Sequence, residues 1–291
     1  MTFSPGAWLA PAVDWLNTNL HPLFGAIAAL VDAIVGGVQA ALLAPPALVV
    51  IAVIAVLALV FLGWRMAVLV VVALGFCFVM DLWKQSMETI ALVTVAVTIS
   101  VLIAVPLGIL AARRPRVEAA LRPILDIMQT VPPWVYLILA VIFFSLGQVP
   151  AIMATIIYGI PPMLRLTTLA FRQVPKDLME LGQAIGAAPR TILTKIEVPA
   201  AMPTLVVGLN QCILLSLAMV VLAGLVGAGG LGAEVTRGLT RMEMGLGLRA
   251  GRPEAADAYV AHGRIHSAHP ATVPSRVAQV HARHVQAGRS I

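Results

Sequence analysis

Three glycines after the last long apolar stretch have the spacing of a phosphate-binding loop. Gly227, Gly229 and Gly232 form the pattern Gly-x-Gly-x-x-Gly, with which dinucleotide-binding folds cradle a pyrophosphate. That chemistry requires a preceding strand and a downstream acid for the ribose, whereas these glycines follow an apolar run. No Gly-x-x-x-x-Gly-Lys-Ser/Thr sequence occurs either. We therefore interpret the glycines as a turn, and we predict no nucleotide cofactor and no catalytic residue.

Histidine is the second residue type that could support chemistry, as a metal ligand. Five of the six histidines lie between His262 and His284. Two pairs have a spacing of three or four residues: His262 with His266, and His281 with His284. No acidic or cysteine partner accompanies them and prolines separate the pairs, so we predict no metal site. The cysteines, Cys77 and Cys212, lie inside apolar runs and are interpreted as packing residues.

A few charged, amide and aromatic side chains interrupt the apolar runs. Asp126 and Arg165 lie near the ends of two runs. They are candidates for a functional salt bridge, but at so shallow a depth we favour snorkelling or local structural pairing. Candidates for lining a solute pathway are Gln129, Trp134, Tyr136, Asn210 and Gln211. Hydrogen bonding between helices explains the three amides equally well.

The polar segment 171–199 carries the most definite local signals. Asp177 is the expected N-cap of a helix, and Glu180 follows three residues later, as in a capping box. Gly186 is placed where a C-cap glycine ends a helix. This segment therefore predicts a short helix between two long apolar runs.

A second short helix is expected between Pro189 and Pro199, because proline favours the first helical turn and cannot continue a helix. On the first helix, Leu178, Leu181 and Ile185 share one face by their spacing. Two uses fit such a pair of helices. They could rest on lipid headgroups, or they could dock on a partner protein.

The composition indicates that membrane helices must position these residues. Apolar residues make up 60% of the chain and charged residues 11%, against about 25% charged in soluble domains. Mean hydropathy is +0.97. The net charge of +6 is scattered over loops and the C-terminal end, and without a basic stripe it gives no reason to expect a nucleic-acid partner. We expect no cleavable signal peptide, because no basic region precedes an apolar stretch at the N-terminus.

Six apolar runs approach the roughly 20 residues that a membrane-spanning helix needs. They cover residues 47–64, 66–80, 89–112, 124–146, 151–170 and 202–226. Basic residues cluster in the connections after the first, third and fifth runs, which places all three clusters on one, cytoplasmic side. The sequence therefore predicts an all-α, polytopic membrane helix bundle with about six spans.

Several motifs resemble those of known transporters. The string Glu180–Ala187, with Gly186 and the later Pro199, resembles the "EAA" loop of ATP-binding cassette (ABC) importer permeases, although Leu181 and Gly182 replace its two alanines. Other segments resemble the permeases of glycine betaine/proline betaine importers: Met87-Glu88-Thr89, Met128-Gln129-Thr130-Val131-Pro132, Val135-Tyr136-Leu137, Pro161-Pro162-Met163-Leu164-Arg165 and Gly227-Ala228-Gly229-Gly230-Leu231-Gly232. The resemblance covers roughly residues 80 to 250.

The resemblance implies a permease subunit of the type I ABC importer kind in a bacterial inner membrane. Two permease copies, separate ATPase subunits and an extracytoplasmic substrate-binding protein would form the importer, and this subunit would not be an enzyme. The binding protein would hold a quaternary amine such as glycine betaine in an aromatic cage. Segment 171–199 becomes a cytoplasmic coupling loop that docks on the ATPase through Asp177, Glu180, Leu181, Gly182, Ala184, Ile185, Gly186 and Pro199.

The expected domain organisation follows from the spans and the resemblance. We expect an extracytoplasmic N-terminal segment (1–44), two membrane helices (45–86), a core permease domain (87–226) and a glycine-rich extracytoplasmic segment (227–250). After Gly251 the chain turns rich in Arg, His, Ala and Pro, and the final span of the related permeases is missing. We expect residues 251–291 to be a disordered tail that comes from a shifted reading frame or a disrupted gene end, which would make the permease defective.

Three alternatives remain at the level of sequence. A permease for another small solute, such as choline, differs only in substrate. A secondary transporter would need a coupling-ion site, yet no Asp or Glu lies near the centre of a predicted span. A mechanosensing or scaffold protein would have no transport role and would bind no ATPase.

Overall fold

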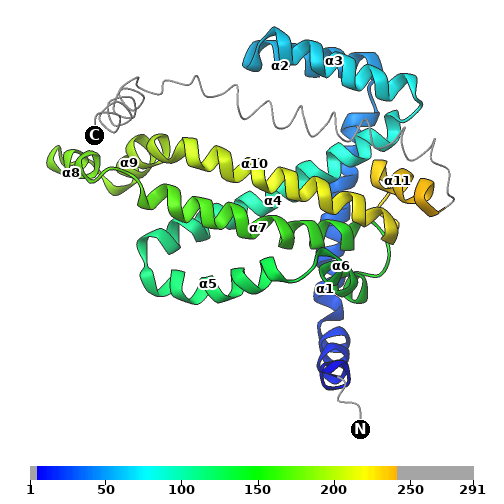
Figure 1. The fold of residues 1–291 in the computed structure, drawn as a ribbon, viewed down its shortest axis with the longest axis horizontal. Helices are drawn as coiled ribbons and strands as arrows, with labels where there is room; N and C mark the ends of the chain where they lie inside the picture. Colours follow the sequence, from blue (N-terminus) through cyan, green and yellow to red (C-terminus); the bar gives the residue numbers. More distant parts are fainter. Residues whose placement is uncertain (1–4, 241–291) are drawn as a thin grey trace, which may run out of the picture.

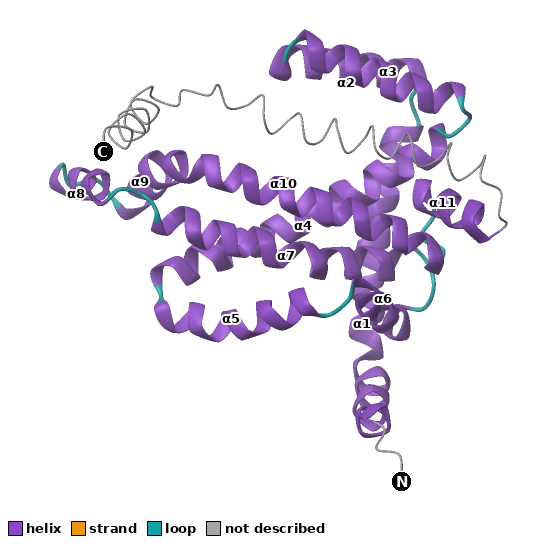
Figure 2. Ribbon diagram, in the orientation of Figure 1, coloured by secondary structure: helices purple, strands orange, loops and turns teal. Residues whose placement is uncertain are grey.

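The computed structural model describes residues 5–240, and every regular element within them is a helix (Figure 1 and Figure 2). The first three are α1 (Pro5–Leu43), α2 (Ala47–Leu62) and α3 (Trp64–Val79). The core contains α4 (Trp83–Arg113), α5 (Pro115–Thr130), α6 (Pro133–Phe144), α7 (Gln148–Arg172) and α10 (Val198–Ala223). The short elements are α8 (Lys176–Ala184), α9 (Pro189–Ile192), a π-helix η1 (Leu193–Glu197), a 3₁₀ turn η2 (Gly224–Val226) and α11 (Gly230–Thr240). The predicted all-α class is confirmed.

Helices α4, α7 and α10 lie side by side and form the centre of the molecule (Figure 1). Small residues let their backbones approach closely. A Cβ atom on Gly108 of α4 would come within 2.6 Å of the Cβ atom of Thr167 on α7. Gly159 of α7 faces the side chains of Ser100 and Cys212 in the same way. Close backbone approach at small residues is typical of helices that associate within a bilayer.

Within residues 5–240, four helical segments are long and apolar enough to cross a membrane, and a fifth is added if the bent pair α5–α6 is one span. The bend between α5 and α6 is 98°. It occurs at Val131 and Pro132, whose extended backbone ends α5, while Pro133 occupies the first turn of α6. The break predicted at these prolines is confirmed, and that the pair crosses the membrane as a single span stays a prediction.

The N-terminal part differs from the expectation. Thr18–Leu43 of α1 is an apolar helix of 26 residues, in a segment for which the sequence predicted no span. The two runs that we assigned as the first spans form helices of only 16 residues each. Small residues and Asp32 make α1 less apolar in sequence. The continuous runs of large aliphatic side chains in α2 and α3 were therefore assigned as the first two spans.

Helices α2 and α3 form a hairpin that turns at Gly63, whose φ is +91°. Apolar side chains are exposed on several faces of this hairpin, among them Val60, Phe61 and Val72. At the turn, the Arg65 guanidinium lies 5.8 Å from the ring centre of Trp64. An aromatic and a basic residue together are typical of a membrane–water interface.

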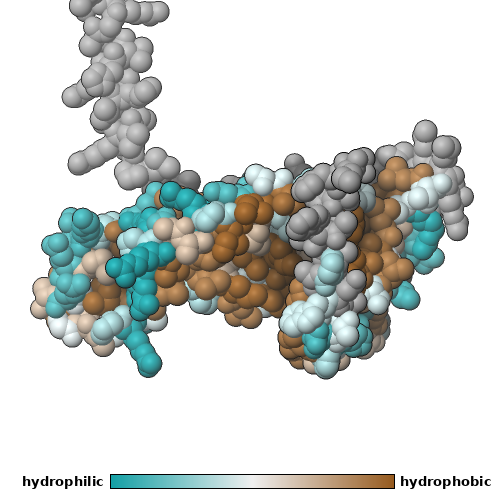
Figure 3. Space-filling view, turned by 90° about the horizontal axis from the view of Figure 1, so that it is seen from below, coloured by the Kyte–Doolittle hydropathy of each residue, from teal (hydrophilic) through white to brown (hydrophobic). Residues whose placement is uncertain are grey.

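The surface has the polarity of a membrane protein. A broad apolar band crosses the middle of the molecule, and hydrophilic side chains gather at the end that carries α8 (Figure 3). The α4–α5 junction lies at this same end, and the α2–α3 turn points toward it (Figure 2). The basic residues of the α4–α5 junction and of segment 171–199 thus lie at one end, as the positive-inside argument requires, whereas the α2–α3 turn that carries Arg65 ends over the middle of the molecule (Figure 1).

Candidate functional site

The predicted coupling loop, residues 171–199, forms a projecting unit at the hydrophilic end of the molecule (Figure 1). Its first helix, α8, begins at Lys176, and Pro175 holds the cap position without a side-chain hydrogen bond. The expected N-cap role of Asp177 is therefore wrong. Its carboxylate lies in the first turn instead, where it interacts favourably with the positive end of the helix dipole.

The end of α8 follows the prediction. Gly186 has a φ of +69°, a left-handed conformation in which glycine carries no steric penalty. The amide of Ala187 donates to the carbonyl of Gly182 at 3.0 Å, and that of Gly186 donates to Gln183 at 2.9 Å. These two bonds are those of a Schellman motif. Gly186 is confirmed as the residue that ends α8.

A substitution at Gly186 tests this cap directly. We expect Gly186→Ala to cost about 1 kcal/mol in the opening free energy of α8, because alanine resists the left-handed conformation. Amide hydrogen exchange of α8 should then be about fivefold faster. Gly75→Ala in α3, where an added Cβ has open space, should leave exchange of α8 unchanged. Equal exchange rates in wild type and Gly186→Ala would contradict the cap.

Two faces of α8 have different roles in the structure. Gly182 is buried against α9 and η1, since an added Cβ would lie 2.7 Å from Ile196 Cδ1 and 3.2 Å from Ile192 Cγ1. Leu181 and Ile185 remain 59% and 72% exposed. The first face attaches α8 to the rest of the chain, and the second presents large apolar side chains without a cover from the described residues.

Pro199 does not end the second helix. The chain continues from α9 through η1 into α10 without a break, and Pro199 lies in the first turn of α10. The prediction failed because the π-helical turn at 193–197 widens the backbone just before the proline, where a regular helix would lose a hydrogen bond. The coupling loop is therefore joined to α10 by continuous helical backbone.

Glu197 anchors this junction to α4. Its side chain is 10% exposed, and its Oε2 accepts a hydrogen bond of 2.6 Å from Arg113 Nη2 at the last turn of α4. Sequence reasoning assigned no separate role to Glu197, because its partner is 84 residues away. A carboxylate just before the proline of the loop was the available signal.

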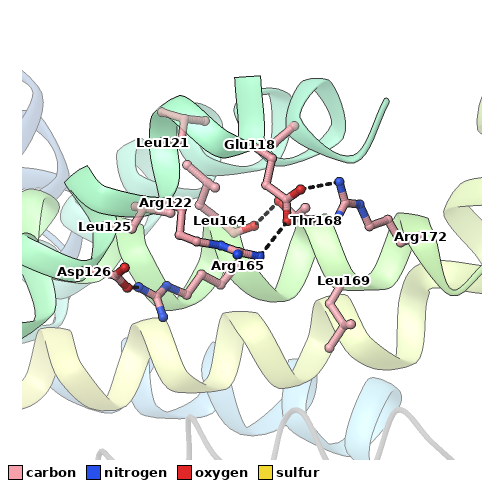
Figure 4. Close-up of a pocket in the computed structure, with 11 residues that line it drawn as sticks. Glu118, Leu121, Arg122, Leu125, Asp126, Leu164, Arg165, Thr168, Leu169 and Arg172 are labelled. Atoms are coloured by element: carbon pink, nitrogen blue, oxygen red, sulfur yellow. Dashed lines mark hydrogen bonds and ion pairs between the residues drawn. The ribbon is translucent and has the colours of Figure 1, made fainter. Parts of the chain in front are cut away.

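Ion pairs also connect α5 with α7 along a cleft of about 280 Å³ (Figure 4). Asp126 accepts a hydrogen bond from Arg165, as the structural pairing interpretation predicted. Glu118 accepts two from Arg172, at 2.8 and 2.5 Å, and one from Arg122 at 3.5 Å. Four leucines, with Ala111 and Thr168, line the remaining walls. Since each arginine already has a carboxylate partner, these side chains chiefly tie α5 to α7.

The five candidate pathway residues fall into two groups. Gln129, Trp134 and Tyr136 flank the α5–α6 bend, where the Tyr136 hydroxyl donates to the Met128 carbonyl at 2.7 Å. Asn210 and Gln211 lie in α10, the first buried and the second exposed. Their role in a pathway stays a prediction. The remaining site candidates need less comment: both cysteines are buried and unbridged, and the histidine pairs lie outside the described residues.

At the opposite end, the glycine-rich segment forms a turn and begins a helix. Gly227, Gly229 and Gly230 all have positive φ angles. The segment follows α10 and η2 rather than a strand, so it lacks the context of a dinucleotide fingerprint. The sequence predicted the turn but not helix α11 after it.

The first turn of α11 is capped by side chains of α4. Gly230 N–H donates to Glu88 Oε2 at 2.9 Å, and Leu231 N–H donates to Thr89 Oγ1 at 2.8 Å. Gly230 must lack a side chain, because a Cβ there would lie 2.6 Å from Thr89 Oγ1. Sequence reasoning quoted Glu88 and Thr89 only as part of a motif, since 142 residues separate them from these partners.

Helix α11 also packs on the end of α10 through glycine. A Cβ on Gly224 would lie 2.6 Å from the backbone nitrogen of Ala233, and Gly232 approaches the backbone at Val220 as closely. Leu231 is fully buried with Leu82. Helix α11 is therefore held from two sides, by polar contacts to α4 and by backbone packing on α10.

The amino-acid sequence is similar to that of known transport proteins. The family model described as "Binding-protein-dependent transport system inner membrane component" matches residues 104–260. The glycine betaine/proline betaine transport system permease protein ProW of Escherichia coli is 43% identical over 240 residues, which are 82% of this chain and 68% of that protein. The glycine betaine transport system permease protein OpuAB of Bacillus subtilis is 37% identical, over 82% of this chain and 85% of the relative.

A solved structure shows the same fold. Inward-facing MetNI, a methionine ABC transporter, contains a chain that aligns with a TM-score of 0.58 and 23% identity, over 65% of this chain and 96% of that one. At this identity the likeness concerns the arrangement of helices alone. It matches the type I ABC permease fold that the sequence motifs implied.

Proposed function

Because the chain belongs to the family of binding-protein-dependent transport system inner membrane components, we propose that it forms the translocation pathway for glycine betaine, proline betaine or a related quaternary amine. It is a multi-pass permease subunit of an ABC importer in the bacterial inner membrane. Such a subunit is not itself an enzyme, and ATP hydrolysis belongs to a separate subunit. Because the chain belongs to this family, it is neither a secondary transporter nor a scaffold protein.

The substrate class rests on one observation. Identity to a glycine betaine/proline betaine permease is 43% and extends over 82% of the chain, so it includes the core helices as well as the loops. A permease adapted to a different solute would be expected to diverge in the helices that contact it. Choline remains the nearest alternative substrate, because it shares the quaternary ammonium group.

The ATPase would dock on the exposed face of α8. Leu181 and Ile185 project from the hydrophilic, cytoplasmic end and are more than half exposed, although large apolar side chains at a water-facing loop normally find a cover. Basic residues such as Lys176 and Arg190 favour a cytoplasmic location for this end. An apolar helix face in a groove is a common mode of protein recognition.

The importer would contain two copies of the permease and an extracytoplasmic binding protein. The binding protein would capture the cation, since an aromatic cage of the type that holds quaternary ammonium groups is the natural source of its specificity. The permease would then offer a weakly binding route. The candidates for that route are the two groups at the α5–α6 bend and in α10.

The test is uptake by the reconstituted importer. Permease, ATPase and binding protein in proteoliposomes should accumulate labelled glycine betaine when ATP is supplied. A hundredfold excess of proline betaine should reduce that uptake at least tenfold, whereas methionine should leave it unchanged. If choline reduced the uptake more strongly than proline betaine does, choline would be the better assignment of the substrate. Uptake that needs no ATPase subunit would refute the importer itself.

A further inference from the structure

Helix α4 forms side-chain hydrogen bonds near both of its ends, with Glu197 of the coupling loop at one end and with α11 at the other. It has 31 residues, and Glu88 and Arg113 are separated by about 37 Å at the rise of an α-helix. Pro106 interrupts its hydrogen bonding, but Thr168 of α7 donates to the nearby Gly108 carbonyl at 3.2 Å. Helix α7 thus contacts the α4 backbone close to this proline.

At the cytoplasmic end, the contact is a charged pair in which the carboxylate is largely buried and the guanidinium is half exposed. Glu197 is one of the two carboxylates that are buried among the residues whose side chains the structure describes, and it belongs to the π-helical turn near the end of the coupling loop. Arg113 reaches it from α4 while remaining half exposed. A hydrogen bond between two charged groups is about twice as strong as a neutral one. This pair therefore fixes the distance between α4 and the start of α10.

At the opposite end, Glu88 and Thr89 bind the first two free amides of α11. The first amides of a helix have no partner within it, and a carboxylate near that end is favoured by the helix dipole. Thr89 is fully buried and also donates to Gln85 at 2.9 Å, so its position is fixed. These contacts hold α11 to α4 while η2 holds it to α10.

We propose that Arg113, Glu197, Glu88 and Thr89 are positioning residues that join α4 and α10 at both ends, so that the two helices move as one body. The closed frame consists of α4, η1, α10 and α11. The idea rests on the proposed docking of the ATPase at the coupling loop. When the ATPase displaces that loop, the frame carries the displacement to α11 on the extracytoplasmic side, along α4 as well as along α10.

The frame makes a specific prediction about pairs of substitutions. Opening either end lets α4 slip against α10, and once one end is open, opening the other adds little. In a reconstituted importer, Glu197→Ala and Glu88→Ala should each lower the amount of substrate imported per ATP hydrolysed at least fivefold. The substrate imported per ATP by the double variant should lie within a factor of two of the value for the more impaired single variant. Two independent local defects would instead multiply, to at least twenty-five-fold.

Controls separate positioning from general damage. Glu118→Ala removes an ion pair of the same kind between α5 and α7, outside the frame, and should retain the wild-type import per ATP. Glu88→Gln keeps an oxygen that can accept the Gly230 amide and should recover most of the loss. If Glu197→Ala does not assemble, the charge exchange Arg113→Glu with Glu197→Arg replaces it, and should import better than Arg113→Glu alone.

Two outcomes overturn the frame while the proposed function stands. One is a multiplicative double variant, and the other is a Glu118→Ala variant that uncouples as strongly as Glu197→Ala. A wild-type importer that does not accumulate substrate with ATP defeats the proposed function instead. Capture of the ATPase, measured on each variant, distinguishes loss of docking from loss of transmission.

Discussion

A Leu181→Glu, Ile185→Glu variant is expected to lose capture of the cytoplasmic ATPase by about thirtyfold or more, since removal of a central apolar contact typically costs at least about 2 kcal/mol. Both side chains are exposed in the isolated permease, so the permease itself should fold and reach the membrane. The two carboxylates would be buried without partners in the docked complex. Co-purification of the ATPase with tagged permease in detergent measures the effect.

The matched control is Gln183→Glu on the same helix. Gln183 is exposed and, two residues from Leu181, points to a different side of α8. It adds a carboxylate without touching the proposed docking face. Capture near the wild-type amount is expected for this control. Undiminished capture by the Leu181/Ile185 variant would show that the ATPase binds elsewhere.

The second large effect is expected from the smallest possible change, Gly224→Ala. The backbone at Gly224 is helical, with φ −55° and ψ −29°, so alanine is conformationally acceptable there. The added methyl group would, however, collide with the backbone of Gly232 and Ala233 in α11. Backbone atoms cannot move aside as a flexible side chain can, and overpacking of this kind costs about 1–3 kcal/mol. We expect import to fall at least tenfold.

Two measurements identify the cause of that loss. ATPase capture should remain normal, because α8 lies at the other end of the molecule (Figure 1). The melting temperature of the purified permease should fall by several degrees. Gly75→Ala, at a helical position with open space, should leave both import and stability unchanged. Normal import by Gly224→Ala would mean that α11 does not need its close contact with α10.

Local signals predicted the local parts of the site. Gly186 ends α8 because a left-handed residue and two backbone hydrogen bonds are a short-range matter, readable from the spacing. The Asp126–Arg165 pair was also accessible, since both residues lie at one depth of neighbouring spans. The family motifs then gave the transporter class that residue-level reasoning alone left open.

The parts that sequence could not supply depend on distant contacts. Glu88 meets Gly230 across 142 residues, and Arg113 meets Glu197 across 84, so no local pattern links them. The prediction that Pro199 ends a helix was wrong because a π-helical turn before it keeps the helix continuous. The N-terminal helix was missed because alanine and glycine contribute little to an apolar signal. Residues 241–291, including the tail that we expected to be disordered, lie outside the described part of the chain.

The shortness of the α2–α3 hairpin has a consequence for the lipid around it. Sixteen residues per helix extend only about 24 Å, whereas the hydrocarbon layer is about 30 Å thick. If the hairpin spans, as its Trp64–Arg65 tip suggests, the bilayer must thin beside it or the tip must be drawn inward, at a fraction of a kcal/mol for each ångström of hydrophobic mismatch. The permease would then be most stable in membranes of short acyl chains, and would gather them along this one flank.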